Sequence, residues 1–125
     1  HEGSIEALTV LPNGLLASGS GDSKIKIWNP EDGSLIRTLS GHFYFINSLV
    51  VLSNGYLASG SGDHSIKIWN PEDGTLIRTL TGHKNWVKSI TVLPNNILAS
   101  GSYDRTINIW DLEDGSLIRT LTLDI

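Results

Sequence analysis

Short stretches of apolar residues, separated by turn-forming residues, run along the whole chain. In the middle third, residues 66–69 alternate apolar and polar side chains with the two-residue period of a β-strand. Residues 46–52, 56–61 and 75–80 are similar stretches, rich in β-branched and aliphatic side chains. Asn54-Gly55 separates the first two of these and predicts a two-residue hairpin turn, because both residue types tolerate positive φ. The pattern predicts a meander of four short strands.

This pattern occurs three times at a fixed interval. Trp28, Trp69 and Trp110 are 41 residues apart, and each ends nearly the same phrase. A period of about 40 residues indicates one supersecondary unit stacked several times. We therefore expect a single domain over residues 1–125, made of three consecutive units. The units cover approximately residues 1–41, 42–82 and 83–125.

Each predicted four-stranded sheet is apolar on both faces. Ile66 and Ile68 point to one side of their strand, and Trp69 can cover the other side. Such a sheet needs a neighbour on each face, which radial stacking of sheets provides. The expected fold class is all-β, with three four-stranded antiparallel sheets stacked side by side.

Three short motifs recur in register with the tryptophans. A Gly-His pair begins the second and third units, an Asp ends each Ser-Gly-Ser-x-Asp segment, and Asn29, Asn70 or Asp111 follows each tryptophan. With these motifs the whole chain resembles the WD-repeat β-propeller family. The resemblance implies a propeller made of blades, acting as a non-catalytic scaffold for protein interactions without a cofactor.

The resemblance also implies a structural hydrogen-bond network in each blade. It joins the His of the Gly-His element, a serine of the second strand, the Asp of the following turn, and the Trp. Two serines of each second strand, such as Ser18 and Ser20, point to the same side, so either could take part. Taking the later serine, the expected members are His1, Ser20, Asp22, Trp28, His42, Ser61, Asp63, Trp69, His83, Ser102, Asp104 and Trp110.

The recurring Ser, His and Asp also suggest a hydrolase triad, but their distribution favours a structural role. A catalytic set is needed once, at an exposed cleft, whereas this set recurs with the packing period and includes a Trp. No two of the four histidines have the spacing of metal ligands, and His64 falls in a turn where we expect exposure. We therefore expect no catalytic residue, no metal site and no cofactor.

Composition narrows the classes of partner. The net charge is −4, and the nine Lys and Arg residues recur with the repeat, whereas a nucleic-acid interface is normally basic on one face. The same distribution argues against a polybasic membrane surface, and no apolar run is long enough for a membrane-spanning helix. Without cysteine there is no disulfide framework. We expect neither nucleic acid nor membrane as a partner.

Three blades are fewer than a closed propeller needs, which makes the chain itself an expected partner. Because Leu123-Asp124-Ile125 stands where a Gly-His element would follow, we expect the arc to end there. Its two end faces would join head-to-tail, giving six blades in a homodimer or nine in a homotrimer. Small residues near the inner strands favour the trimer, since they do not require a tightly filled centre: Ala7, Ser48 and Ser89.

The loops differ between the copies far more than the strands do, as expected of a scaffold with a variable surface. Phe43 and Tyr44 correspond to Lys84 and Asn85 in the third copy, and Tyr103, beside Arg105, replaces a glycine. Phe43, Tyr44, Tyr103 and Arg105 are our candidate partner-binding residues, although the aromatic ones could instead pack over a neighbouring blade. Phe45 and Trp86 are better explained by packing between blades.

Two hypotheses of function remain. In the first, the protein is a self-assembling propeller that presents its loop face to a protein or peptide. In the second, it is a purely structural fragment of amplified or designed repeats with no dedicated ligand. Loop variation favours the first hypothesis, and the uniformity of the strands favours the second.

Overall fold

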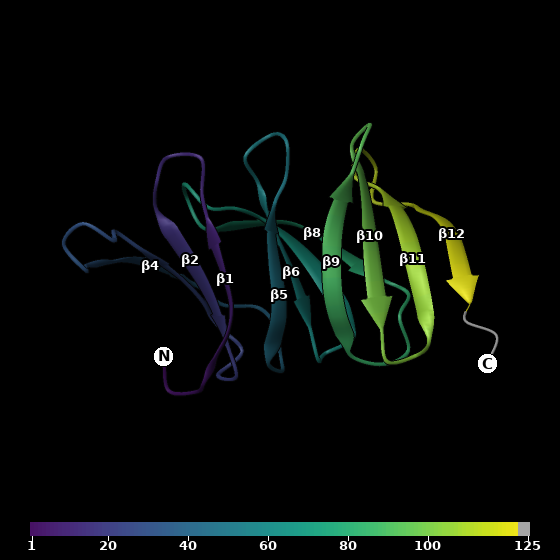
Figure 1. Ribbon diagram of the computed structural model, residues 1–125, viewed down its shortest axis with the longest axis horizontal. Coiled ribbons are helices and arrows are strands. Elements are labelled where there is room, and N and C mark those ends of the chain that lie inside the picture. The colour runs from purple at the N-terminus through teal and green to yellow at the C-terminus, as the bar shows by residue number, and fades with distance from the viewer. Residues whose placement is uncertain (123–125) are drawn as a thin grey trace.

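The computed structural model describes residues 1–122, which form three four-stranded antiparallel sheets (Figure 1). In each sheet the strands follow one another in chain order. The first sheet contains β1 (Ile5–Val10), β2 (Leu16–Ser20), β3 (Ile25–Trp28) and β4 (Leu35–Leu39). The second contains β5 (Ile46–Val51), β6 (Leu57–Ser61), β7 (Ser65–Asn70) and β8 (Thr75–Thr81). The third contains β9 (Val87–Leu93), β10 (Ile97–Ser102), β11 (Thr106–Asp111) and β12 (Leu117–Thr122).

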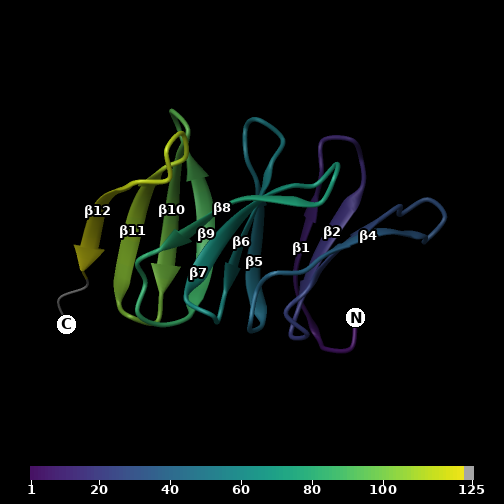
Figure 2. The ribbon, with the colours of Figure 1, turned by 180° about the vertical axis from the view of Figure 1, so that it is seen from behind.

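The three sheets, called blades one, two and three, fan out from a common centre. The first strands of the blades, β1, β5 and β9, lie next to one another, with β5 in the middle. The last strands lie outermost, with β4 and β12 at opposite ends of the molecule and β8 between them at the back (Figures 1 and 2). This arrangement confirms the predicted all-β fold of three four-stranded blades. Leu123, Asp124 and Ile125, where a Gly-His element was expected, lie outside the described residues.

The hairpin between β5 and β6 differs from the predicted two-residue turn. The backbone N–H of Leu52 bonds to the carbonyl of Tyr56, so the loop contains three residues, and the N–H of Gly55 bonds back to the carbonyl of Leu52. Only Gly55 of this loop has positive φ, at 88°. A tight turn followed by one left-handed residue is the usual three-residue hairpin, and glycine takes that position at least steric cost.

The hydrophobic core lies between the blades and not within any one of them. Between blades one and two, Ala17, Ile25 and Leu39 pack against Ile46 and Trp69. Between blades two and three, the equivalent residues of blade two pack in the same way against Val87, Leu98 and Trp110. Each contact between neighbouring blades, called a joint below, therefore uses one face of each of the two sheets. Sheets that are apolar on both faces need such a neighbour on each side.

The two ends of the described arc each leave one blade face without a neighbour from the same chain. On blade one this face carries Ile5, Leu8 and Val10, which are exposed. On blade three it carries Ile107 and Leu121, also exposed. Their equivalents inside the arc are buried or half-buried, so the exposure results from position in the arc and not from residue type.

Candidate functional site

A chain of hydrogen bonds joins four side chains within each blade. In blade two, the indole Nε1–H of Trp69 donates to Ser59 Oγ at 2.9 Å, and Ser59 Oγ lies 2.6 Å from His42 Nε2. The other ring nitrogen, Nδ1, lies 2.7 Å from Asp63 Oδ2. Since the carboxylate can only accept, Nδ1 carries a proton, and Nε2 accepts from the serine hydroxyl in the neutral imidazole. The four groups thereby satisfy one another.

The same chain of bonds is present in the other two blades. In blade one the Trp28–Ser18, Ser18–His1 and His1–Asp22 distances are 2.8, 2.7 and 2.8 Å. Blade three has the equivalent bonds among its tryptophan, serine, histidine and aspartate, at 2.8, 2.7 and 2.9 Å: Trp110, Ser100, His83 and Asp104. The near-equal distances show that the network belongs to the repeat and not to one special blade.

The serine of this network is the earlier one of each pair, not the expected Ser20, Ser61 and Ser102. Those three hydroxyls instead accept a bond from the backbone N–H of Asp22, Asp63 and Asp104, each at 3.0 Å. Two residues along a strand is a shift of about 6.6 Å. The later serine therefore lies at the turn, while the earlier one lies beside the tryptophan and the histidine. Both serines do point to the same side, as expected.

The aspartate of each network also fixes the loop that precedes the blade. In blade two, Asp63 accepts from the backbone N–H of Phe43 at 3.0 Å and from the hydroxyl of Ser65 at 2.6 Å. Burial would raise the pKa of Asp63, but the bonds from His42 and Ser65 outweigh it and hold this pKa well below its usual range. The carboxylate thus stays ionised and ties the loop that begins at His42 to the turn after β6.

We expect acid to weaken the fold through these carboxylates. Because the pKa of Asp63 is lower in the folded chain than in the unfolded one, its contribution is complete above about pH 5 and is lost as the pH falls further. The midpoint temperature of thermal unfolding, followed by circular dichroism, should decrease as the pH is lowered from 5 to 2. Asp63→Asn should lower the midpoint at pH 7 and flatten this dependence. Asp73→Asn, at an exposed turn aspartate, is the control and should change the slope less; an equal change would contradict the role of Asp63.

Aromatic side chains from blades two and three gather at the same end of the blades. Trp86 lies at the centre, with ring centroids 6.2 Å from Tyr44, 4.9 Å from Phe45 and 5.3 Å from Tyr103. Tyr44 and Phe45 are themselves 4.6 Å apart. These four residues are called the aromatic cluster below. Tyr44 and Tyr103, which are 59 positions apart in sequence, thus meet through Trp86.

The candidate binding residues differ in how they relate to this cluster. Tyr44 and Tyr103 belong to it and are 52% and 48% exposed. Phe43 lies next to Tyr44 in the loop and is 91% exposed. Arg105 is exposed in the turn after β10, with φ of 70°. Phe45 and Trp86 are half-buried, and Phe45 covers Gly62, where an added Cβ would come within 2.7 Å of its ring.

Sequence reasoning missed Lys88 as a neighbour of the cluster. Its ammonium donates to the hydroxyl of Tyr103 at 3.1 Å and lies 5.1 Å from the centroid of that ring. The pairing of Val87 with Ser102 between β9 and β10 places these two side chains together. Lys88 is the extra residue of a β-bulge, since Ser102 pairs with Val87 and Gly101 pairs with Ser89, so strand alternation could not have indicated this position.

A match to a protein-family model now identifies the repeat. The model of the WD domain, G-beta repeat, matches three consecutive segments of the chain, at residues 1–29, 33–70 and 74–111. The chain belongs to the WD40 repeat family. WD40 domains are generally non-catalytic scaffolds for protein interactions.

Known proteins match different lengths of the chain. Nuclear distribution protein nudF 2 of Penicillium rubens is 51% identical over 43 residues, which are 34% of this chain and 9% of that protein. The solved structures of U3-55K and of the RRP9 WD40 repeats each match with a TM-score of 0.91 at 29% identity. Each structural match covers 98% of this chain and 40% of the other. The chain therefore spans well under half the length of these relatives.

The WD40 network has the order of a hydrolase triad but not its accessibility. Ser59 is fully buried, and its hydroxyl already accepts a bond from Trp69. A nucleophile must reach a substrate, so this serine is placed as a structural link. Within residues 1–122, no three His, Cys, Asp or Glu side chains are grouped closely enough to hold a metal ion. In the same part of the chain, no helix has the length and apolar character needed to cross a membrane.

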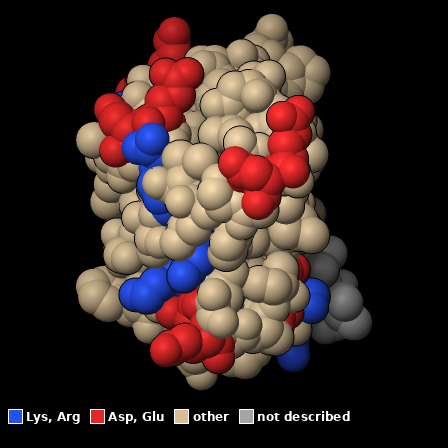
Figure 3. Space-filling view, turned by 90° about the vertical axis from the view of Figure 1, so that its left-hand side faces the viewer, with Lys and Arg blue, Asp and Glu red and all other residues tan. Residues whose placement is uncertain are grey.

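On one side of this WD40 chain the charges are scattered. Figure 3 views the molecule from the side on which β4 lies, and acidic and basic side chains there alternate with broad uncharged areas. No large field of one sign covers this side. The view agrees with the mild net charge of −4.

Proposed function

We propose that this WD40 chain is a non-catalytic scaffold that binds a protein or peptide through one end of blades two and three. This end, called the loop face, is formed by the loops before β5 and β9 and the turn after β10. The observation that supports this proposal is the aromatic cluster, with Phe43 exposed beside it. Large aromatic side chains provide much of the binding energy in protein interfaces because they bury a large area at low entropic cost.

The position of the cluster favours a specific surface over general packing. Blade one has Gly3, Ser4 and Gly21 where the cluster has Tyr44, Phe45 or Trp86, and Tyr103. The blade folds in the same way without these rings, so the aromatic side chains are not needed for the fold. Lys88 and Arg105 place positive charge near Tyr103. The partner we propose is a peptide segment that combines an apolar anchor with a carboxylate.

A random peptide library displayed on phage tests this proposal. Peptides selected on the chain should bind at least tenfold more weakly to a Phe43→Ala/Tyr44→Ala/Tyr103→Ala variant, because the exposed anchors are removed. Fluorescence anisotropy with synthesised peptides measures the change. The matched control is Leu35→Ala/Ile77→Ala, which removes exposed apolar side chains from the outer strands and should leave affinity unchanged. Equal binding to the triple variant would contradict the proposal.

We further propose that copies of the chain complete the propeller between them. The exposed end faces of blades one and three support association, and three copies would give nine blades where two give six. Small side chains near the centre favour the homotrimer over the homodimer: Ala7, Ser48 and Ser89.

The mass of the assembly decides the number of copies. We expect light scattering with absolute mass determination to give three times the chain mass of 13.6 kDa at micromolar concentration. Twice that mass would favour the six-bladed homodimer. A stable single-chain mass would contradict self-assembly.

A further inference from the structure

The two joints inside the arc are built from equivalent residues. At the first joint, Ile46 lies over Gly19 so closely that a Cβ on this glycine would come 2.6 Å from Ile46 Cγ2. At the second joint, Val87 lies over Gly60, with 2.8 Å to its Cγ1. A branched side chain of one blade thus fills a slot that a glycine leaves in the blade before it. The slot admits no larger residue, so the pairing is specific in shape.

The exposed faces at the ends of the arc carry the two halves of this same joint. Blade one presents Ile5, Leu8, Leu16 and Trp28, which have the same residue types as Ile46, Leu49, Leu57 and Trp69 of the first joint. Blade three presents Ala99, Gly101, Ile107, Ile109 and Leu121, which have the same types as Ala17, Gly19, Ile25, Ile27 and Leu39 opposite them.

Two glycine slots are open at these ends. The nearest described atom to a Cβ on Gly101 is the carbonyl oxygen of Ser89, at 4.0 Å. Apart from its two chain neighbours, no described residue has an atom within 4 Å of a Cβ on Gly33, whereas the equivalent Gly74 and Gly115 are packed by Leu39 and Arg78 of the blade before. One slot is thus vacant on each end face.

We propose that a second copy of this chain joins the first with its blade one packed on blade three of the first copy, so that each copy fills the open slot of the other. Ile5 of one copy enters the Gly101 slot of the other, as Val87 enters the Gly60 slot within the chain. Arg119 of blade three lies over Gly33 of the next copy. The inference rests on the self-assembly part of the proposed function and specifies which surfaces join.

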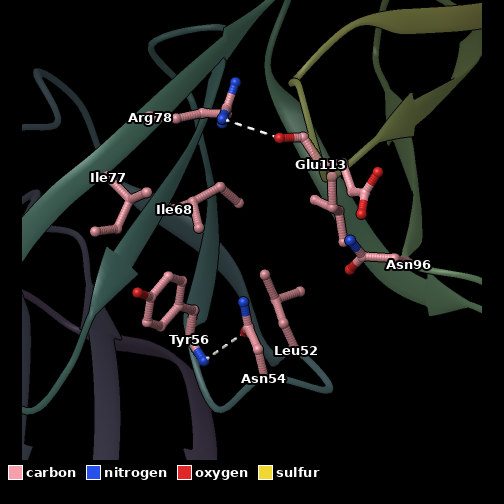
Figure 4. Close-up of a pocket in the computed structure, with 9 residues that line it drawn as sticks. Leu52, Asn54, Tyr56, Ile68, Ile77, Arg78, Asn96 and Glu113 are labelled. Carbon is pink, nitrogen blue, oxygen red and sulfur yellow. Dashed lines mark hydrogen bonds between the residues drawn. The ribbon is translucent and has the colours of Figure 1, made fainter.

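Polar contacts across the internal joint support the same pairing. Arg78 Nη2 donates to the carbonyl of Glu113 at 3.2 Å across the joint between blades two and three (Figure 4). Arg119 and Glu31 are the corresponding residues at the end faces. Ser48 Oγ accepts from the backbone N–H of Ile90 at 3.2 Å, and Ser89 corresponds to Ser48. Both bonds can therefore form again between copies.

The two end faces are complementary to each other and not to themselves. Blade one offers Ile5 for the Gly101 slot, and blade three offers Arg119 for the Gly33 slot. Pairing of two identical faces would set Ile5 against Ile5, or slot against slot. The contact is therefore head-to-tail, and such contacts continue until a ring closes or a filament grows.

Engineered cysteines test this joint, because the chain has no cysteine of its own. At the internal joint the Cβ of Val87 lies 3.5 Å from a Cβ built on Gly60, within the usual range for a disulfide of about 3.5–4.5 Å. Ile5→Cys/Gly101→Cys should therefore oxidise between copies and give covalent multimers on a non-reducing gel. Gly60→Cys/Val87→Cys is the matched control, and it should oxidise within one chain and keep the single-chain mass.

The single variants separate head-to-tail pairing from other contacts. Ile5→Cys alone and Gly101→Cys alone should keep free thiols, and a mixture of the two should form a covalent pair. The proposal is overturned if the double variant keeps free thiols while the control oxidises, or if each single variant dimerises as readily as the mixture.

Charged substitutions provide a second test that does not depend on cysteine. Leu8→Glu blocks the blade-one face and Ile107→Glu blocks the blade-three face, and both positions are exposed in the arc. Each variant alone should be monomeric by light scattering, and a one-to-one mixture should give a two-chain complex. Self-pairing of either variant would contradict the proposed packing of blade one on blade three. A wild-type mass other than three chains, with this mixture still pairing, would refute only the homotrimer.

Discussion

Replacing Trp69 with alanine is expected to lower the free energy of unfolding by about 3–5 kcal/mol, the usual cost of removing a large aromatic side chain from a core. Trp69 is only 2% exposed and packs against blade one in the first joint. It also donates to Ser59, so the substitution removes a bond of the network together with the packing. Urea denaturation followed by circular dichroism measures the change. A loss below about 1 kcal/mol would show that the blades do not stabilise one another through this residue.

Trp28 is a matched control for this experiment, because it has the same network bond in a different position. Trp28 Nε1 donates to Ser18 at 2.8 Å, but its ring lies on the end face and is half-buried. In a single separated chain, Trp28→Ala should therefore lower the free energy of unfolding by less than Trp69→Ala does. If copies join through the end faces, the two costs should approach each other as protein concentration rises. The difference between the two variants thus measures how far the face of blade one is covered.

Much of the fold follows from local features of the sequence. The two-residue alternation at residues 66–69 marks a strand, and its recurrence every 41 residues requires three equivalent sheets. Apolar residues on both faces require neighbours on both sides, which explains why the core lies between blades. These features depend on residues that are near one another along a strand, and the pattern of apolar and polar residues in the sequence predicts them well.

The details that sequence reasoning missed depend on position along a strand and on turn geometry. Asn54-Gly55 indicates a hairpin, but the loop has three residues because only Gly55 takes the left-handed conformation. Ser18 and Ser20 share a face, and the choice between them depends on which one lies beside Trp28. The strand pairing settles this, since Ser18 is opposite Lys26, two residues before the tryptophan.

The aromatic cluster shows a further limit of sequence reasoning. Phe45 and Trp86 are expected to pack between blades, and Tyr44 and Tyr103 are expected either to bind a partner or to pack over a neighbouring blade. The structure joins all four, because the loops before β5 and β9 meet the turn after β10 at one end of adjacent blades. The order of the blades in the arc, and not any local motif, creates this surface.

Replacing Ser59 with alanine is expected to lower the free energy of unfolding by about 2–4 kcal/mol, because two buried groups lose their partner at once. The indole N–H of Trp69 and Nε2 of His42 both bond to this hydroxyl, and the whole set is buried. Alanine leaves both groups without a partner, and because they are buried neither can form a hydrogen bond to water instead. Urea denaturation at pH 7 gives the magnitude.

Ser61→Ala is the matched control, since it removes the same hydroxyl two residues further along the same strand. Ser61 accepts from the backbone N–H of Asp63 and donates to the carbonyl of Phe45 at 2.8 Å, so its loss should cost about 1 kcal/mol. His42 and Trp69 keep their bonds in that variant. A larger loss for Ser61→Ala than for Ser59→Ala would place the linking hydroxyl at the later serine after all. We expect the loss of unfolding free energy to be larger for Ser59→Ala, because only Ser59 lies between the tryptophan and the histidine.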